Sequence, residues 1–187
     1  MVDERFRRKV KRAVADNFDQ SWEIYQAFEA RHGFFYQLAV ELARAVGVRP
    51  GSRVLDVGCG NGISCRALAA EFSCRVLGVD LSPRMVAAGR QQLAASDNIE
   101  LLVGDGERLG ELLAGRMFDY VLYNAAIFIF PDPESTFREA AACLAPGGRI
   151  GFSFYPSLEG PTGEDLLLLA FTRLGEPPPR YRVITDY

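Results

Sequence analysis

Residues 54–62 read Val-Leu-Asp-Val-Gly-Cys-Gly-Asn-Gly, in which an apolar run leads into an acid and three alternating glycines. The apolar run predicts a short buried strand, and the glycines predict a sharp turn directly after it. Gly58, Gly60 and Gly62 carry no Cβ atom, so a ligand can lie directly against backbone N–H groups. This segment therefore predicts a ligand-binding turn at the end of a first strand.

The residues of this turn differ from those of a phosphate-binding loop. The dinucleotide fingerprint is G-x-G-x-x-G, whereas residue 63 is Ile and Asp56 lies inside the motif. A carboxylate at a strand end favours positive charge through Coulomb attraction and through hydrogen bonds to an ammonium group or its waters. The turn therefore indicates a cationic ligand.

Residues 54–62 resemble motif I of the class I S-adenosylmethionine-dependent methyltransferases, whose cofactor carries both an ammonium and a sulfonium. The resemblance covers roughly residues 15–155, and four further segments match the family in order and spacing. It implies S-adenosylmethionine as the cofactor. In the turn, it implies cofactor contacts from Asp56, Gly58, Cys59, Gly60 and Asn61.

The second segment, residues 76–82, is an apolar and β-branched run that ends at Asp80. Asp80 follows the turn by about 20 residues, where a doubly wound sheet brings the next strand end beside the first. The resemblance implies that Asp80 accepts hydrogen bonds from both ribose hydroxyls, and that Leu81 to Met85 pack on the adenine. The alternative is that Asp80 caps the next helix, although Ser82 followed by Pro83 suits that position better.

The third segment, residues 99–107, is another strand that ends in an acid. The resemblance implies that Asp105 accepts a hydrogen bond from the adenine amino group and that the Gly106 N–H donates to a ring nitrogen. Glu107 completes the cofactor-binding residues expected here. Alanine is more usual at the position of Gly106, so this residue departs mildly from the family.

The fourth and fifth segments are residues 118–130, with Asn124 at the end of a buried strand, and residues 144–154. The latter predict a helix end, a Pro-Gly-Gly turn and a strand. Asn124 is a further candidate for cofactor binding. Five strand ends at the spacing of one family indicate an α/β fold, namely a Rossmann-like doubly wound sheet that is mostly parallel.

The pattern of apolar residues predicts two or three helices before the first strand, followed by βα alternation with right-handed crossovers. We expect three regions: a helical cap over residues 1–48, a cofactor-binding core over 49–155, and a tail over 156–187. The expected strands lie near residues 53–57, 75–79, 99–103, 119–123 and 149–155. The expected helices cover residues 63–71, 83–95, 109–114 and 133–144.

The tail is too short for the closing antiparallel hairpin of the family. Residues 163–174 predict one helix, and residues 181–185 predict a strand or an extended segment. We therefore expect the C-terminal strands to be incomplete and the chain to be part of a longer protein. An exposed edge on the fifth strand would favour aggregation or a homodimer.

Composition is that of a globular protein, with 187 residues, 49% hydrophobic, 24% charged and a net charge of −3. Nothing in the net charge indicates nucleic acid, and no apolar run is long enough for a membrane span. The N-terminus does not have the pattern of a signal peptide. Four cysteines show no metal-ligand spacing with the single His32, so we expect no metal, and reduced thiols in a cytoplasmic protein.

Three residues of the N-terminal helices are candidates for the site. His32 has the only side chain whose unperturbed pKa suits a general base near neutrality, but a histidine beside Gly33 also suits a helix end. Tyr25 is placed where related enzymes set an aromatic ring against the methionine part of the cofactor, although core packing explains it nearly as well. Arg31 could pair with the cofactor carboxylate or could be an exposed helix charge.

The segment after the fourth strand narrows the range of acceptor substrates that we expect. It reads Asn-Ala-Ala-Ile and lacks the Pro-Pro-aromatic set with which some amino methyltransferases hold a planar amide. The chain also has no Pro-Cys pair of the kind used in cytosine C5 methylation. Apolar residues 127–130, with Phe152, Phe154 and Tyr155, suit a small and partly apolar acceptor, as in the quinone- and biotin-pathway methyltransferases.

Two other functions stay open at this stage. Six cations in residues 5–12 could bind RNA or an acidic carrier protein that presents the substrate, although a solvated helix face is the commoner explanation. The chain could also bind the cofactor as a non-catalytic subunit. The expected function is O- or C-methylation of a small acceptor, with nucleic acid and membrane not expected as partners.

Overall fold

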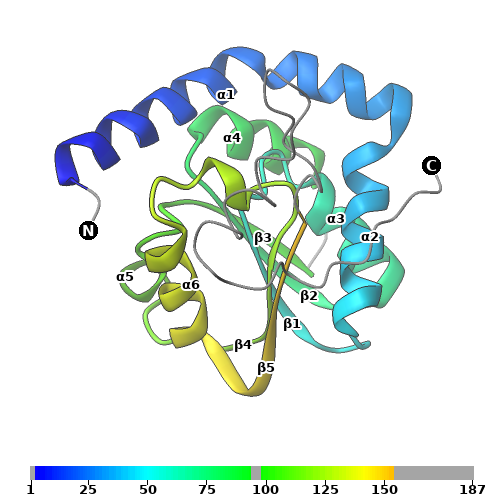
Figure 1. Ribbon diagram of the computed structural model, residues 1–187. Coiled ribbons are helices and arrows are strands. Elements are labelled where there is room, and N and C mark those ends of the chain that lie inside the picture. Colours follow the sequence, from blue (N-terminus) through cyan, green and yellow to red (C-terminus); the bar gives the residue numbers. More distant parts are fainter. Residues whose placement is uncertain (1–2, 94–97, 154–187) are drawn as a thin grey trace, which may run out of the picture. The chain divides into compact units, whose positions relative to one another are not determined.

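The computed structural model describes residues 3–93 and 98–153, which form one five-stranded sheet with helices on both sides (Figure 1). The strand order is β3-β2-β1-β4-β5, and every neighbouring pair is parallel. The order reverses direction between β1 and β4, which is the switch point of a doubly wound sheet. The expected Rossmann-like α/β fold is confirmed.

The strands are β1 (Arg53–Val57), β2 (Arg75–Asp80), β3 (Ile99–Val103), β4 (Phe118–Tyr123) and β5 (Leu144–Phe152). The helices are α1 (Glu4–His32), α2 (Phe34–Val46), α3 (Ile63–Phe72), α4 (Pro83–Gln92), α5 (Leu109–Leu113) and α6 (Pro133–Ala142). A 3-10 turn, η1 (Ile127–Ile129), follows β4.

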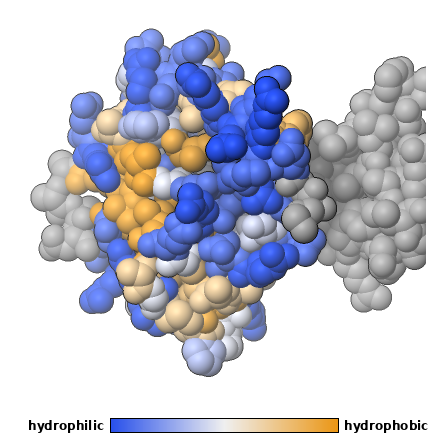
Figure 2. All heavy atoms as spheres, turned by 90° about the vertical axis from the view of Figure 1, so that its left-hand side faces the viewer, coloured by the Kyte–Doolittle hydropathy of each residue, from blue (hydrophilic) through white to orange (hydrophobic). Residues whose placement is uncertain are grey.

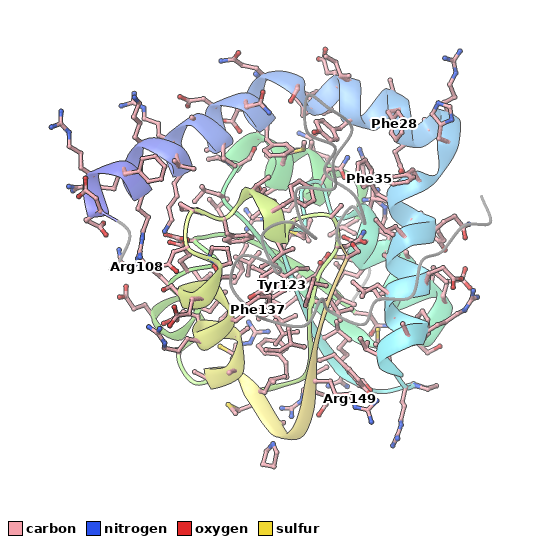
Figure 3. The ribbon with its side chains drawn as sticks, in the orientation of Figure 1. Phe28, Phe35, Arg108, Tyr123, Phe137 and Arg149 are labelled. Carbon is pink, nitrogen blue, oxygen red and sulfur yellow. The ribbon has the colours of Figure 1, made fainter. Side chains whose placement is uncertain are left out.

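The core has two layers because alternate residues of each strand face opposite sides of the sheet. On one side, Val54 of β1 and Leu122 of β4 pack with Leu42 of α2 and Leu68 of α3 in a buried cluster. On the other side, the Tyr123 ring packs edge-on against Phe137 of α6, with ring centroids 5.7 Å apart (Figure 3). Burial on both faces explains why the strands read as continuous apolar runs.

The N-terminal cap consists of two helices, of which α1 is 29 residues long and runs over α4 (Figure 1). Asp3 caps its start, and Gly33 ends it in the left-handed conformation. Both α1 and α2 belong to the same compact unit as the sheet, Met1–Ser153.

Two sequence-based helix ends are wrong. The helix expected over residues 83–95 ends at Gln92, with Leu93 as its C-cap. The helix expected over residues 133–144 ends at Ala142, and Leu144 already pairs with Phe118 as the first residue of β5. The Pro-Gly-Gly segment lies inside β5, where the register shifts between the Phe118 and Tyr120 pairs. Gly147 accommodates this irregularity with φ 78°. The strand continues through the turn because both of its flanks pair with β4.

Apolar surface lies among mainly hydrophilic side chains on the face shown in Figure 2. Among the described residues, the large apolar side chains exposed to solvent, on this face or another, include Phe6, Ile24, Phe28 and Phe128. No helix in this part of the chain is both long and apolar enough to cross a membrane. The helix and strand expected in residues 163–185, and the proposed loss of the closing hairpin, lie outside the described residues.

Candidate functional site

The glycine turn lies at the carboxyl end of β1, beside the switch point of the sheet, where open α/β sheets bind their ligands. Gly58, Gly60 and Gly62 have φ of 80°, 54° and 73°, a region that side chains with a Cβ atom rarely adopt. A Cβ atom on Gly58 would also lie 2.6 Å from the Cβ of Ala126. Glycine is therefore required at this turn by conformation and by packing.

The backbone N–H groups of this turn are largely used within the protein. Those of Gly58 and Cys59 donate to the Val79 carbonyl at 2.8 and 3.1 Å, and that of Gly62 donates to the Cys59 carbonyl. The Gly60 N–H donates to Asp80. The glycines thus shape the turn, and four of its N–H groups serve the fold before any ligand.

Asp80 at the end of β2 joins three elements of the site. Its Oδ2 accepts from the Gly60 N–H and its Oδ1 accepts from the Ser82 N–H, each at 2.8 Å. Burial raises the pKa of the Asp80 carboxyl above its ordinary value, against the effect of these bonds. The helix cap of α4 is Ser82, whose Oγ accepts from the Met85 N–H, so the alternative of Asp80 as cap is wrong.

Asp56 lies at the base of the same turn, with no exposed surface. Its Oδ2 accepts hydrogen bonds from the Ser64 hydroxyl and, at 3.4 Å, from the Cys65 thiol. Its Oδ1 has no partner among the described residues. Burial raises the pKa of Asp56 to about 6, while the Ser64 hydrogen bond acts in the opposite direction.

Asn61 and Met85 lie where the turn meets α4. Both side chains are buried, and the Asn61 Nδ2 has no hydrogen-bond acceptor among the described residues. A Cβ atom on Gly89 of α4 would lie 2.6 Å from the Asn61 carbonyl oxygen, so the helix packs closely on the turn. Leu81 lies between β2 and α4 and is partly buried. Two unpaired polar atoms, on Asp56 and Asn61, thus lie at one turn, as a polar ligand would require.

Asp105 and Glu107 follow β3 and are tied to each other and to α1. The Glu107 N–H donates to Asp105 Oδ1 at 2.9 Å. Lys11 of α1 places its Nζ 2.6 Å from Asp105 Oδ2 and 2.6 Å from Glu107 Oε2. Gly106 between them has no room for a side chain, because a Cβ atom would lie 2.6 Å from Val57 and 2.8 Å from Phe130.

Asn124 at the end of β4 is nearly buried and anchors the N-terminal cap. Its Nδ2 donates to the Phe35 carbonyl at 3.0 Å, and its Oδ1 accepts from the Ser153 hydroxyl at 3.3 Å. Ser153 also accepts from the Ala125 N–H. The structure thus gives Asn124 a role in positioning α2, and its contact with a cofactor stays a prediction.

The aromatic residues of α1 and α2 form a cluster at the corner between the two helices (Figure 3). Tyr25 is partly buried, with its ring 5.3 Å from that of Phe18 and 5.9 Å from that of Phe35. His32 is exposed at the end of α1 and packs on Phe28 at 4.8 Å, a position that suits a helix end. Its role as a base stays a prediction.

Sequence reasoning missed the side chains of α1 that hold the strand ends. Asp19 accepts from the Ser82 hydroxyl and, at 3.2 Å, from the Arg84 N–H. Arg7 pairs with Asp132, which caps α6. Arg7 and Asp19 lie four and eight residues from Lys11, and this helical spacing could have shown that the three share a face of α1. Their partners could not have been found in this way, because they lie 63 to 125 residues away in the chain.

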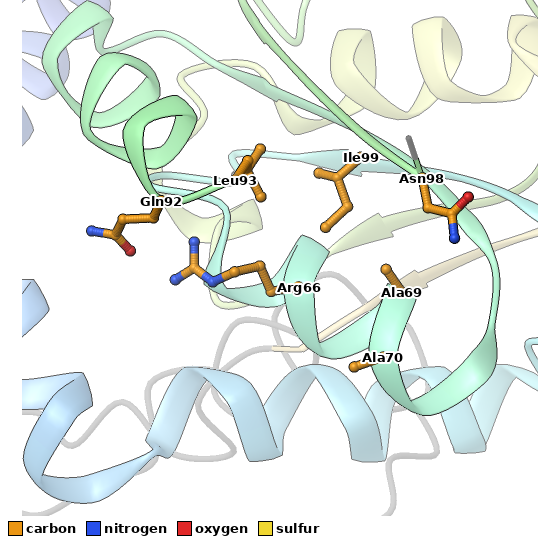
Figure 4. Close-up of a pocket in the computed structure, with 7 residues that line it drawn as sticks. All are labelled: Arg66, Ala69, Ala70, Gln92, Leu93, Asn98 and Ile99. Carbon is orange, nitrogen blue, oxygen red and sulfur yellow. The ribbon is translucent and has the colours of Figure 1, made fainter. Parts of the chain in front are cut away.

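A cavity of about 310 Å³ lies elsewhere, between α3, the end of α4 and the start of β3 (Figure 4). Arg66, Gln92 and Asn98 supply its polar groups. It adjoins the amino end of β3, whereas the acids considered above follow the carboxyl ends of strands. In the described residues, no group of three His, Cys, Asp or Glu side chains is arranged to hold a metal ion.

The family of this chain follows from its sequence together with this geometry. The family model of the methyltransferase domain matches residues 55–152, from the first strand to the fifth, so the chain belongs to that family. The aklanonic acid methyltransferase of Streptomyces sp. strain C5 is 34% identical over 149 residues, which are 76% of this chain and 65% of that protein.

Two further relatives extend the comparison. The ubiquinone biosynthesis O-methyltransferase of Xanthomonas campestris is 36% identical over 105 residues, or 56% of this chain and 43% of that protein. An amino pentose methyltransferase from Micromonospora echinaspora, solved with S-adenosylmethionine bound, is 28% identical with a TM-score of 0.59, covering 71% of this chain and 57% of that one. The chain spans less than two thirds of the length of each of these relatives.

Proposed function

We propose that this chain binds S-adenosylmethionine and transfers its methyl group to an oxygen or carbon of a small, partly apolar acceptor. The observation that carries this proposal is the arrangement of Asp80 and the glycine turn, joined by the Gly60 N–H, at the switch point of a methyltransferase-family sheet. The relatives named above are all methyltransferases, which supports methyl transfer as the reaction.

The residues at the strand ends fit the chemistry of this cofactor. Each oxygen of a carboxylate can accept more than one hydrogen bond, so Asp80 can accept from ribose hydroxyls while it holds Gly60 and Ser82. Asp56 Oδ1 and Asn61 Nδ2 are the unpaired polar atoms at the turn. We assign Asp80 to the ribose, Asp105 to the adenine amino group, and the turn from Gly58 to Asn61 to the methionine part.

When bound, the cofactor supplies a methyl group that is activated by its bond to a sulfonium sulfur, and this sulfur becomes a neutral thioether once the methyl group is transferred. The chain's own residues then have to position the two reactants and to exclude water, and near-attack positioning contributes on the order of 7 kcal/mol. A base is needed only where the acceptor is an acidic group such as a hydroxyl. His32 lies exposed at the end of α1, so we do not base the mechanism on it.

The apolar side chains near the end of β4 support the proposed acceptor class. Phe128 of η1 is 50% exposed, whereas Ile127 is buried and Phe130 packs on Tyr123. Phe154 and Tyr155, which we expected beside them, lie outside the described residues. A partly exposed aromatic ring near the strand ends favours an acceptor with an apolar body.

The basic residues of α1 give little support to RNA or a carrier protein as partner. Arg7 and Lys11 pair with acids of the core, and Arg12 pairs with Asp16 on α1 itself. Arg5, Arg8 and Lys9 are exposed. A gel shift of RNA that weakens with salt would favour the RNA function over the small-molecule one.

Calorimetric titration with S-adenosylmethionine, S-adenosylhomocysteine and NADH tests the cofactor assignment. We expect micromolar binding of the first two and none of NADH. Release of S-adenosylhomocysteine is then followed with a panel of small phenols, hydroquinones and carboxylic acids. Cofactor binding without turnover of any acceptor or carrier-linked substrate would instead support a non-catalytic subunit, and failure to bind would contradict the proposal.

A further inference from the structure

Two cations of α1 meet three acids of the core at the end of β3. The acids are Asp105 and Glu107, which follow β3, and Asp132, which precedes α6. Lys11 contacts the first two, and Arg7 pairs with Asp132 and lies 3.6 Å from Glu107 Oε2. Glu107 Oε1 also accepts from the Asp132 N–H at 3.0 Å. We call these five residues the α1 ion cluster.

The α1 ion cluster differs from a surface salt bridge in its burial. The Glu107 side chain is 1% exposed and the Lys11 side chain 16%, whereas exposed ion pairs of α1 such as Arg12 with Asp16 lie in solvent. A buried charge persists only when it is paired and hydrogen-bonded, so the Glu107 carboxylate depends on its cations. The Lys11 ammonium is the nearest of them.

Lys11 also fixes the direction of the Asp105 carboxylate. Asp105 Oδ1 is held by the Glu107 N–H at 2.9 Å and Oδ2 is held by Lys11 at 2.6 Å. Two donors on the two oxygens leave little rotation about the Cβ–Cγ bond, while each oxygen keeps a lone pair for another donor. The same carboxylate is the one we assign to the adenine amino group.

We propose that Lys11, reaching from the N-terminal helix, is a positioning residue that holds Asp105 in the orientation that selects an adenine amino group. This inference rests on the proposed function, because it concerns the same cofactor. Lys11 has only donors and cannot itself accept from an amino group, so it acts through Asp105. An amino group donates to this carboxylate, whereas a ring carbonyl in the same place would face it as a second acceptor.

The test compares two ligands that differ at this group and at the adjacent ring nitrogen, which is an acceptor in adenine and an N–H donor in hypoxanthine. The ring nitrogen affects the wild type and the Lys11 variants alike, so a change of the ratio between them reports on the contact of Asp105 with the amino group. S-adenosylhomocysteine carries the amino group, and its deaminated analogue S-inosylhomocysteine carries a carbonyl. Calorimetry should show that the wild-type chain prefers the first by roughly 10-fold or more, as expected for one hydrogen bond to a charged acceptor. In Lys11→Met this ratio should fall severalfold, and in Lys11→Arg most of it should return.

The matched control is Lys9→Met, which removes the same charge from an exposed position two residues away. It should leave the ratio unchanged. The double variant Lys11→Met/Asp105→Asn tests whether Lys11 acts through Asp105. If it does, the double variant should show the same ratio as Asp105→Asn alone. Lys11→Gln, which keeps a donor at the end of a shorter side chain, replaces Lys11→Met if circular dichroism shows that the latter is unfolded.

A lower melting temperature in Lys11→Met with an unchanged ratio would overturn the inference and leave Lys11 a purely structural residue. An additive loss in the double variant would do the same. Failure of the wild-type chain to bind S-adenosylhomocysteine would contradict the proposed function itself, and is thus distinguished from failure of this inference.

Discussion

The Asp80 carboxylate at the end of β2 accepts a 2.8 Å hydrogen bond from the Gly60 N–H in the turn after β1. This bond crosses between neighbouring strand ends that are 20 residues apart in the chain. It holds the turn in place before any ligand arrives, and each oxygen of this partly buried aspartate keeps a lone pair for a further donor. The site is thus preorganised by one of the residues that we expect to bind the cofactor.

Replacement of Asp80 by Ala should weaken S-adenosylmethionine binding by roughly 1.5 to 3 kcal/mol, because a charged acceptor for the ribose is lost. Calorimetric titration measures the change. Ser82→Ala is the control, since it removes the cap of α4 and keeps the carboxylate. It should lower the melting temperature with little effect on affinity, and equal affinities of Asp80→Ala and wild type would contradict the ribose assignment.

Stability should depend on pH through Asp56. Its folded-state pKa of about 6 lies above the ordinary value of 3.8, so the folded protein binds the proton more tightly than the unfolded chain. The resulting stability is full below about pH 4 and is lost as pH rises to about 6, a loss of about 3 kcal/mol at 1.36 kcal/mol per unit. Urea unfolding between pH 4 and 7 measures this contribution.

Asp56→Asn should remove this part of the pH dependence, because the amide oxygen can still accept from Ser64 and carries no charge. Asp16→Asn, at an exposed position of α1, should leave the dependence in place. The same slope in Asp56→Asn and wild type would show that another group titrates.

Gly106→Ala should destabilise the fold by roughly 1 to 3 kcal/mol, because the new methyl group would press on Val57 and Phe130. Thermal and urea unfolding measure the loss. The control is Gly110→Ala in α5, where the nearest atom would be 3.4 Å away and helix propensity should make the change neutral or stabilising. Wild-type stability in Gly106→Ala would mean that Val57 and Phe130 move aside at little cost.

Glu29→Ala should cost about 1 kcal/mol of unfolding free energy, because Glu29 near the end of α1 caps the start of α2. Its two carboxylate oxygens accept from the Phe35 and Tyr36 N–H groups at 2.8 and 3.0 Å. Glu23→Ala changes an exposed glutamate of the same helix and should be nearly neutral. Equal losses in the two variants would argue against the cap.

The sequence alone predicted the class of fold and the first four strands, because these depend on local signals. The apolar run before Asp56 favours a buried strand, and the glycines after it favour a turn with positive φ, as the structure shows. In the same way Ser82 and Pro83 determine where α4 begins. The end of α6 was misplaced because pairing between Leu144 and Phe118 extends β5 backwards.

Only the tertiary structure decided how these parts combine into a site. The pairing of Lys11 with Asp105 spans 94 residues, and that of Asn124 with the Phe35 carbonyl spans 89. Gly106 could be read as a mild departure from the family, but the absence of space beside Val57 and Phe130 explains it only in three dimensions. Periodicity shows which face of a helix is polar, whereas packing selects the distant partner that each charge meets.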